Sequence, residues 1–125
     1  MNRIITVIVI FLLVIGLAVC ESVYTISVSE QVKYQLNTAL ELYKDGDSEK
    51  AEESLKKADK LWNNSTVFLD AFLNHDNVEE IAERIAATRS TLKYDSEHFP
   101  IECERAVLSL KVVIYSMLPY FDNIL

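Results

Sequence analysis

The chain has 125 residues, half of them hydrophobic, with only two glycines and two prolines. So few chain breakers exclude a fold of many short strands, which needs a turn about every 8–12 residues, and favour long helices. The formal charge is −7, and Arg3 is the only charged residue before Glu21. The acidic excess therefore lies after residue 20, where it repels phosphate backbones and argues against nucleic-acid binding.

Residues 4–20 form an uncharged, mostly aliphatic run. At 1.5 Å per residue a helix of this length spans about 25 Å, slightly less than the ~30 Å hydrocarbon core of a bilayer. Val23, Tyr24 and Ile26 can extend it, with Tyr24 at the depth of the lipid headgroups. A domain of this size cannot surround such a segment, and we predict a transmembrane helix that contacts membrane lipid.

Positive charge predicts the orientation of this helix. Arg3 and the amino terminus precede the apolar run, whereas the next basic residue after it is Lys33. Basic residues near a span stay on the cytoplasmic side, so we expect a single-pass protein of the cell membrane with a cytoplasmic N-terminus. The predicted division is an anchor over residues 1–23 and an extracytoplasmic helical domain over residues 24–125.

Two other interpretations of the apolar run stay open. A cleaved secretory signal has an apolar region of about 7–15 residues and an A-x-A-like site, of which Ala18-Val19-Cys20 is a poor version. A lipoprotein signal places a lipidated cysteine after small residues, and here Val19 is bulkier than the residue usual before that cysteine. Both alternatives leave the same domain on the same side, and the uncleaved anchor is the preferred prediction.

Three further segments carry apolar residues at spacings of three and four, which predicts amphipathic helices over residues 24–43, 51–72 and 78–92. Trp62, Phe68 and Phe72 fall on the apolar face of the second of these and are expected in the core. Gly46 suits the left-handed conformation that ends a helix. The expected caps are Asp47 or Ser48 for the second helix and Asp76 or Asn77 for the third. Short connections favour antiparallel neighbours, so we predict an all-α fold of about four bundled helices.

The predicted fourth helix differs from the other three. Pro100 suits its first turn, and residues 106–121 are apolar on nearly every side. A helix with one solvated face has a single apolar stripe, so this one is either the central helix of the bundle or a docking surface for another protein or the membrane interface. The residues expected to bind a partner are Val112, Val113, Tyr115, Tyr120 and Phe121.

Several short stretches resemble the bacterial domain-of-unknown-function family 4363. They are Glu49-Lys50-Ala51-Glu52 leading to Leu61-Trp62, Phe72-Leu73-Asn74-His75-Asp76-Asn77-Val78-Glu79-Glu80-Ile81, and Asp122-Asn123-Ile124-Leu125. Trp62, His75 and Asn123 match positions of the family, whereas Ser48 stands where its members often have an aromatic residue. The resemblance implies a membrane-associated helical protein with no assigned activity, and a small multi-spanning membrane protein as a partner.

Two sets of residues have side chains that can bind metal or act in catalysis. They are His75 with Asp76 and Glu79, and His98 with Glu102 and Cys103. Neither matches a known metal or nucleophile spacing, and a histidine beside an acidic helix cap or in a connection accounts for each set. We therefore expect no metal, no cofactor and no catalytic residue, and expect Cys20 and Cys103 to be unpaired.

These observations favour a non-enzymatic interaction or accessory module for another membrane protein. The alternative is a lipoprotein or secreted helical domain that binds a small ligand.

Overall fold

The computed structural model describes the backbone of residues 2–124 and the side chains of that range except those of Phe72 and residues 118–124. The elements in chain order are α1 (Asn2–Lys44), α2 (Ser48–Phe72), α3 (His75–Tyr94), the short 3-10 helix η1 (Ser96–His98) and α4 (Phe99–Ile124). No strand occurs in the described range. The all-α prediction is confirmed.

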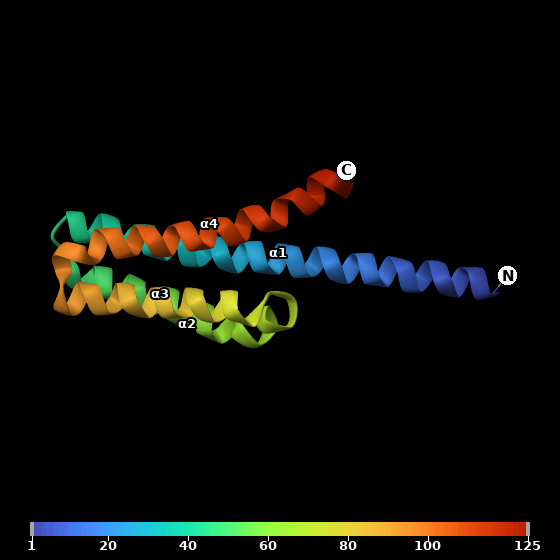
Figure 1. Ribbon diagram of the computed structural model, residues 1–125, viewed down its shortest axis with the longest axis horizontal. Coiled ribbons are helices and arrows are strands. Elements are labelled where there is room, and N and C mark those ends of the chain that lie inside the picture. Colours follow the sequence, from blue (N-terminus) through green and yellow to red (C-terminus); the bar gives the residue numbers. More distant parts are fainter. Residues whose placement is uncertain (1, 125) are drawn as a thin grey trace.

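The helices form an antiparallel bundle in which each helix contacts its two neighbours. α1 packs on α2 and α4, and α3 packs on the same two helices from the opposite side (Figure 1). The connections are short, which forces successive helices to run in opposite directions. α4 is therefore one of four equivalent positions in the bundle and not a central helix surrounded by the others, as one prediction had it.

α1 is one unbroken helix of 43 residues, about 65 Å at 1.5 Å per residue. Its first part projects beyond the bundle (Figure 1). The side chains of residues 2–20 are exposed. Burial begins at Thr25 among the described side chains. The buried face then recurs at spacings of three and four, as expected for a packed amphipathic helix: Thr25, Val28, Ser29, Val32, Leu36 and Ala39. The expected division at residue 23 stays a prediction.

The connection from α1 to α2 depends on Gly46. Its φ of 85° lies in the left-handed region, which a residue without a Cβ adopts at little cost. The backbone N–H of Asp47 donates to the carbonyl of Leu42 at 2.9 Å, and that of Gly46 donates to Tyr43 at 3.0 Å. The Asp47 side chain accepts from the N–H of Lys50 at 3.2 Å. This confirms Asp47 as the cap of α2 and Gly46 as the left-handed residue in the turn that follows α1.

α3 begins earlier than the sequence pattern indicates. The cap is Asn74, whose side chain accepts from the N–H of Asp76 at 3.1 Å, so the prediction of Asp76 or Asn77 was wrong. Polar residues in the first turn hid the start, because the apolar periodicity begins only at Val78. α4 begins at Phe99, and Pro100 occupies its first turn as predicted.

Buried polar contacts tie the four helices together around the apolar core. The Trp62 indole donates to the Val78 carbonyl at 3.0 Å and joins α2 to α3. The Cys103 thiol donates to the Leu36 carbonyl at 3.2 Å and joins α4 to α1. Phe68, predicted in the core, is instead 55% exposed, and its ring lies 5.0 Å from that of Tyr24. The Phe72 side chain lies outside the described residues.

Trp62→Phe should lower the free energy of unfolding by about 1–3 kcal/mol, since it leaves the buried Val78 carbonyl without its donor and removes part of a buried ring. Urea unfolding of the detergent-solubilised chain, followed by circular dichroism, measures the change. Tyr34→Ala, at a position 66% exposed, is the control and should leave the midpoint unchanged. Equal midpoints for the two variants would contradict this packing.

Candidate functional site

α4 presents one apolar face to the core and a second apolar stripe to solvent. The buried face includes Phe99, Cys103, Ala106, Val107, Leu110, Val113 and Ile114. The solvent-facing stripe consists of Ile101, Leu108, Val112 and Tyr115, all at least half exposed. Spacings of seven, four and three place these four residues along one side of the helix. The stripe accounts for the apolar excess that the sequence shows between residues 106 and 121.

The structure separates the residues that were expected to bind a partner. Val112 and Tyr115 are 67% and 63% exposed and belong to the stripe. Val113 is only 7% exposed and belongs to the core, because one residue along a helix turns the side chain by about 100°. It cannot contribute surface to a partner without unpacking. Tyr120 and Phe121 belong to α4, but the structure does not describe their side chains.

A shallow hollow of about 330 Å³ lies between α3 and α4, next to the stripe. Its lining residues are Arg84 from α3 and Arg105, Leu108, Ser109 and Val112 from α4. The hollow thus shares Leu108 and Val112 with the stripe, and together they form one surface, the α3–α4 groove. Sequence reasoning missed Arg84, Leu108 and Ile101, because only packing shows which apolar positions of α4 remain uncovered.

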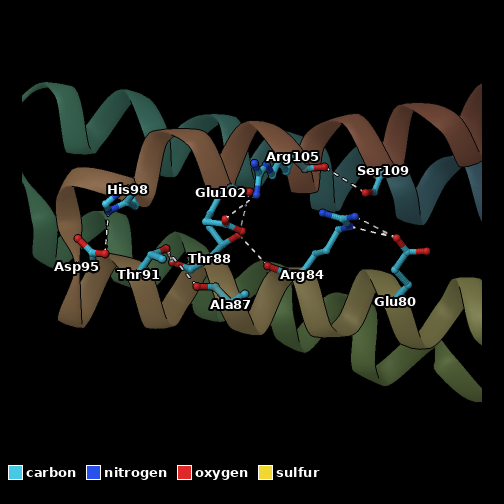
Figure 2. A network of polar contacts seen from close by, with 10 residues as sticks. All are labelled: Glu80, Arg84, Ala87, Thr88, Thr91, Asp95, His98, Glu102, Arg105 and Ser109. Carbon is cyan, nitrogen blue, oxygen red and sulfur yellow. Dashed lines mark hydrogen bonds and ion pairs between the residues drawn. The ribbon is translucent and has the colours of Figure 1, made fainter.

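Both arginines of the α3–α4 groove are paired with carboxylates on their own helices (Figure 2). Arg84 Nη2 lies 3.1 Å from Glu80 Oε1, and Arg105 Nη1 lies 3.2 Å from Glu102 Oε1. Each pair is largely neutral in sum and solvent-exposed, so its attraction for an anionic ligand is weak. The groove is therefore suited to an apolar side chain flanked by hydrogen-bonding groups, more than to a phosphate or carboxylate.

Thr88 fixes the spacing of α3 and α4 beneath the groove. Its fully buried hydroxyl lies 2.8 Å from the Arg84 carbonyl and 3.3 Å from the Glu102 carbonyl on the facing helix (Figure 2). Ser109 Oγ donates to the Arg105 carbonyl at 3.1 Å on the other wall. Backbone groups thus satisfy both hydroxyls, and the walls of the groove are held in place by the same contacts that hold the bundle together.

His75 sits at the end of the bundle from which the apolar part of α1 projects. Its Nδ1 lies 3.1 Å from Asp70 Oδ1, and its Nε2 lies 3.6 Å from Glu79 Oε2. The hydrogen bond to Asp70, aided by the negative charges of Asp70, Glu79 and Asp76, raises the pKa of His75 above its ordinary value. The sequence pointed to Glu79 but missed Asp70, because a helix break separates Asp70 from His75.

His98 lies at the opposite end of the bundle, within η1. Its Nδ1 is 2.7 Å from Asp95 Oδ2, and this hydrogen bond and charge raise the pKa of His98. Glu102 pairs with Arg105 instead. Cys103 is buried, and that burial raises the pKa of its thiol to about 12, so the group is a poor nucleophile.

His98, Glu102 and Cys103 have different bonding partners, namely Asp95, Arg105 and the Leu36 carbonyl, and both cysteines are unpaired. Within the described residues no three side chains of His, Cys, Asp or Glu are grouped as metal ligands.

Comparison with protein families supplies the classification. A family model described as "Domain of unknown function (DUF4363)" matches residues 19–124. The chain belongs to this family. The DUF4363 match covers the whole bundle, including the stripe and both histidines, and so confirms the resemblance noted in the sequence. No curated protein and no solved structure matches the chain. The DUF4363 description itself assigns no activity, so function must be argued from the surfaces of the bundle.

Both histidines should titrate above 6.5, which NMR of their imidazole protons as a function of pH will show. Asp70→Asn should lower the pKa of His75 and leave that of His98 unchanged, since Asp70 is the main cause of the first shift only. Because protonation is favoured in the folded state, any stabilisation is complete below pH 6.5 and is lost as the pH rises through the raised pKa values. An unchanged His75 titration in the Asp70 variant would contradict the contact.

Proposed function

We propose that the chain is a non-enzymatic, membrane-anchored helical module. It docks on another membrane protein through the α3–α4 groove, which includes the exposed stripe of α4. The stripe carries the proposal: a helix whose core face is already satisfied still exposes Leu108, Val112 and Tyr115 in a row. A contiguous apolar surface of this kind is typical of a protein interaction site. The adjacent hollow provides a recess for a partner's side chain.

The chemistry of the titratable groups supports a binding role over catalysis. The two histidines lie at opposite ends of the bundle, and each is exposed and paired with a carboxylate. The thiol of Cys103 is buried and has a raised pKa. A catalytic site needs a nucleophile, a base and an orienting group within hydrogen-bonding distance of one another, whereas the bonding partners of these groups are carboxylates for the histidines and the Leu36 carbonyl for the thiol. The acidic excess and the paired arginines disfavour nucleic acid as a ligand.

The first part of α1 supports the proposal that the module is anchored in a membrane. α1 is long and apolar enough to cross a bilayer, and the side chains of its apolar run are exposed in the folded chain. Leaving each large aliphatic side chain in water forgoes about 1.5–3 kcal/mol, so this run is far more stable in hydrocarbon. Arg3 before the run and the lack of a basic residue until Lys33 favour a cytoplasmic N-terminus and an extracytoplasmic bundle.

The direction of the stripe favours a partner that is itself in the membrane. α1 and α4 are antiparallel neighbours, so the stripe runs roughly along the axis of the anchor and ends near the side from which the anchor leaves (Figure 1). A multi-spanning membrane protein can meet such a surface with the extramembrane end of one of its helices. Membrane anchoring also restricts the encounter to two dimensions, which raises the effective concentration of a weak partner.

Photo-crosslinking in native membranes tests the docking surface. A photoreactive amino acid at Leu108 should give a discrete adduct with a membrane protein, and Val112→Asp should reduce that adduct several-fold by placing an unpaired charge at the interface. Tyr94→Asp makes a comparable change at an exposed site away from the stripe and should leave the adduct intact. Equal adduct yields in the two variants, with helicity unchanged, would contradict the proposed surface.

Alkaline extraction and protease protection test the anchor and its orientation. The full-length chain should remain in the bilayer at high pH, and a tag after Leu125 should be digested in intact spheroplasts while a tag before Met1 is protected. A protected C-terminal tag would reverse the orientation. The mass of the mature chain distinguishes the alternative, since a lipoprotein would begin at Cys20 and carry added acyl groups. Either form keeps the bundle, because burial among the described side chains begins at Thr25.

A further inference from the structure

The height of the bundle above the anchor is fixed by the helix that joins them. α1 runs without a break from Asn2 to Lys44, so no flexible linker separates its apolar run from its packed half. A tethered domain on a flexible linker can stand away from a membrane, but a domain built on the same rigid helix cannot. Which residues of the bundle lie at the membrane surface therefore follows from the register of the helices.

The contacts of α1 define this register. The ring centroids of Tyr24 on α1 and Phe68 on α2 lie 5.0 Å apart. Each residue is 22 positions away in sequence from Gly46, which lies in the turn between the two helices. α2 continues four residues beyond Phe68, about 6 Å of helix. Its last residue, Phe72, therefore has its backbone level with Cys20, where the apolar run ends.

α4 reaches the same level from the other side. The Cys103 thiol bonds to the Leu36 carbonyl of α1. Tyr115 lies 12 residues after Cys103, and Tyr24 lies 12 residues before Leu36. Because α1 and α4 are antiparallel, the two tyrosines stand at similar heights along the bundle. Tyr24, Phe68 and Tyr115 thus form one tier of aromatic residues on three helices. The last turns of α4 extend past this tier, along the anchor side of the bundle (Figure 1).

The length of the apolar run places this tier at the membrane interface. Residues 4–20 span about 25 Å, slightly less than a hydrocarbon core of about 30 Å, and a bilayer thins locally to match a short span, so the hydrocarbon edge lies near Cys20. The tier stands about 6 Å beyond that edge, among the headgroups, and Asp70 lies in the same polar layer. Tyrosine and phenylalanine side chains favour this depth, as in the aromatic belts of membrane proteins.

The α2 surface at this level is apolar and exposed. Val67 is 84% exposed and Phe68 is 55% exposed, although they occupy the last turns of a helix whose other exposed residues are mostly charged or polar. Val23 on α1 is also more than half exposed. All three residues lie on α2 and α1, away from the α3–α4 groove, and each keeps more than half of its surface exposed.

We propose that the end of the bundle formed by the last turns of α2 rests in the interfacial layer of the bilayer, with Val67 and Phe68 in contact with lipid. This inference depends on the proposed insertion of α1 and adds a second, peripheral membrane contact to it. The contact is apolar and not electrostatic, because Asp70 and Asp76 share this end of the bundle. Zwitterionic lipid is therefore the preferred surface, and anionic lipid opposes the contact by repulsion.

Fluorescence quenching by lipid tests the contact in the full-length chain. Single cysteines are introduced by Val67→Cys, Tyr94→Cys and Leu13→Cys in a Cys20→Ser background, where buried Cys103 remains unreactive. Each variant carries a polarity-sensitive dye and is reconstituted in phosphatidylcholine vesicles containing lipid with a quencher near the headgroup or along the acyl chain. Tyr94 is the matched control, since it is as exposed as Val67 but lies next to η1 at the far end of the bundle.

The dye at Val67 should be blue-shifted and quenched several-fold more strongly by the headgroup-level quencher than the dye at Tyr94, and a fraction of anionic lipid should weaken this quenching. Quenching at Leu13 without quenching at Val67 would overturn the inference and leave the anchor intact. A blue shift at Val67 without lipid quenching would also overturn it, since that result indicates cover by a second copy of the chain. Absence of quenching at Leu13 would overturn both this inference and the proposed anchor.

Discussion

The architecture depends on α1 running unbroken from an exposed apolar half into a half that packs in the bundle. Its first half has apolar side chains on all sides and is compatible with hydrocarbon, whereas its second half has a single buried face that α2 and α4 share. Because one continuous helix carries both halves, the bundle has a fixed position and axis relative to the apolar half. If this half is inserted in a membrane as proposed, the positions of the groove, the aromatic tier and the two histidines relative to that membrane follow from this continuity.

The cross-helix polar contacts explain why the bundle has one register. Apolar side chains of similar size can pack in several offsets, but an offset that leaves a buried donor without its acceptor costs free energy. The Trp62 indole donates to the Val78 carbonyl, and the Cys103 thiol donates to the Leu36 carbonyl. Thr88 bridges α3 to α4 in the same way. These contacts favour the offset in which Tyr24, Phe68 and Tyr115 come level, which is the offset on which the proposed lipid contact depends.

The α3–α4 groove and the apolar end of α2 differ in shape and in the charged residues around them, and these differences favour different partners. The α3–α4 groove is flanked by Arg84 and Arg105, each paired with glutamate, and offers hydrogen-bonding groups around an apolar floor. The end of α2 offers Val67 and Phe68 without such a recess, beside acidic residues and at the level where the anchor leaves the bundle. A shaped recess suits a protein side chain, whereas a convex apolar edge at interfacial depth suits lipid.

The helices, the apolar run, the turn at Gly46 and the family could all be predicted from the sequence, because periodicity, length, composition and short motifs are local features that depend on neighbouring residues. Sequence patterns placed Val113 with Val112 on a partner surface and Phe68 in the core, and they missed the pairing of Asp70 with His75. These points became clear only from the packing of the helices. Burial and pairing depend on which helix covers which face, and a helix apolar on nearly every side, as α4 is, does not reveal from its own sequence which side its neighbours occupy.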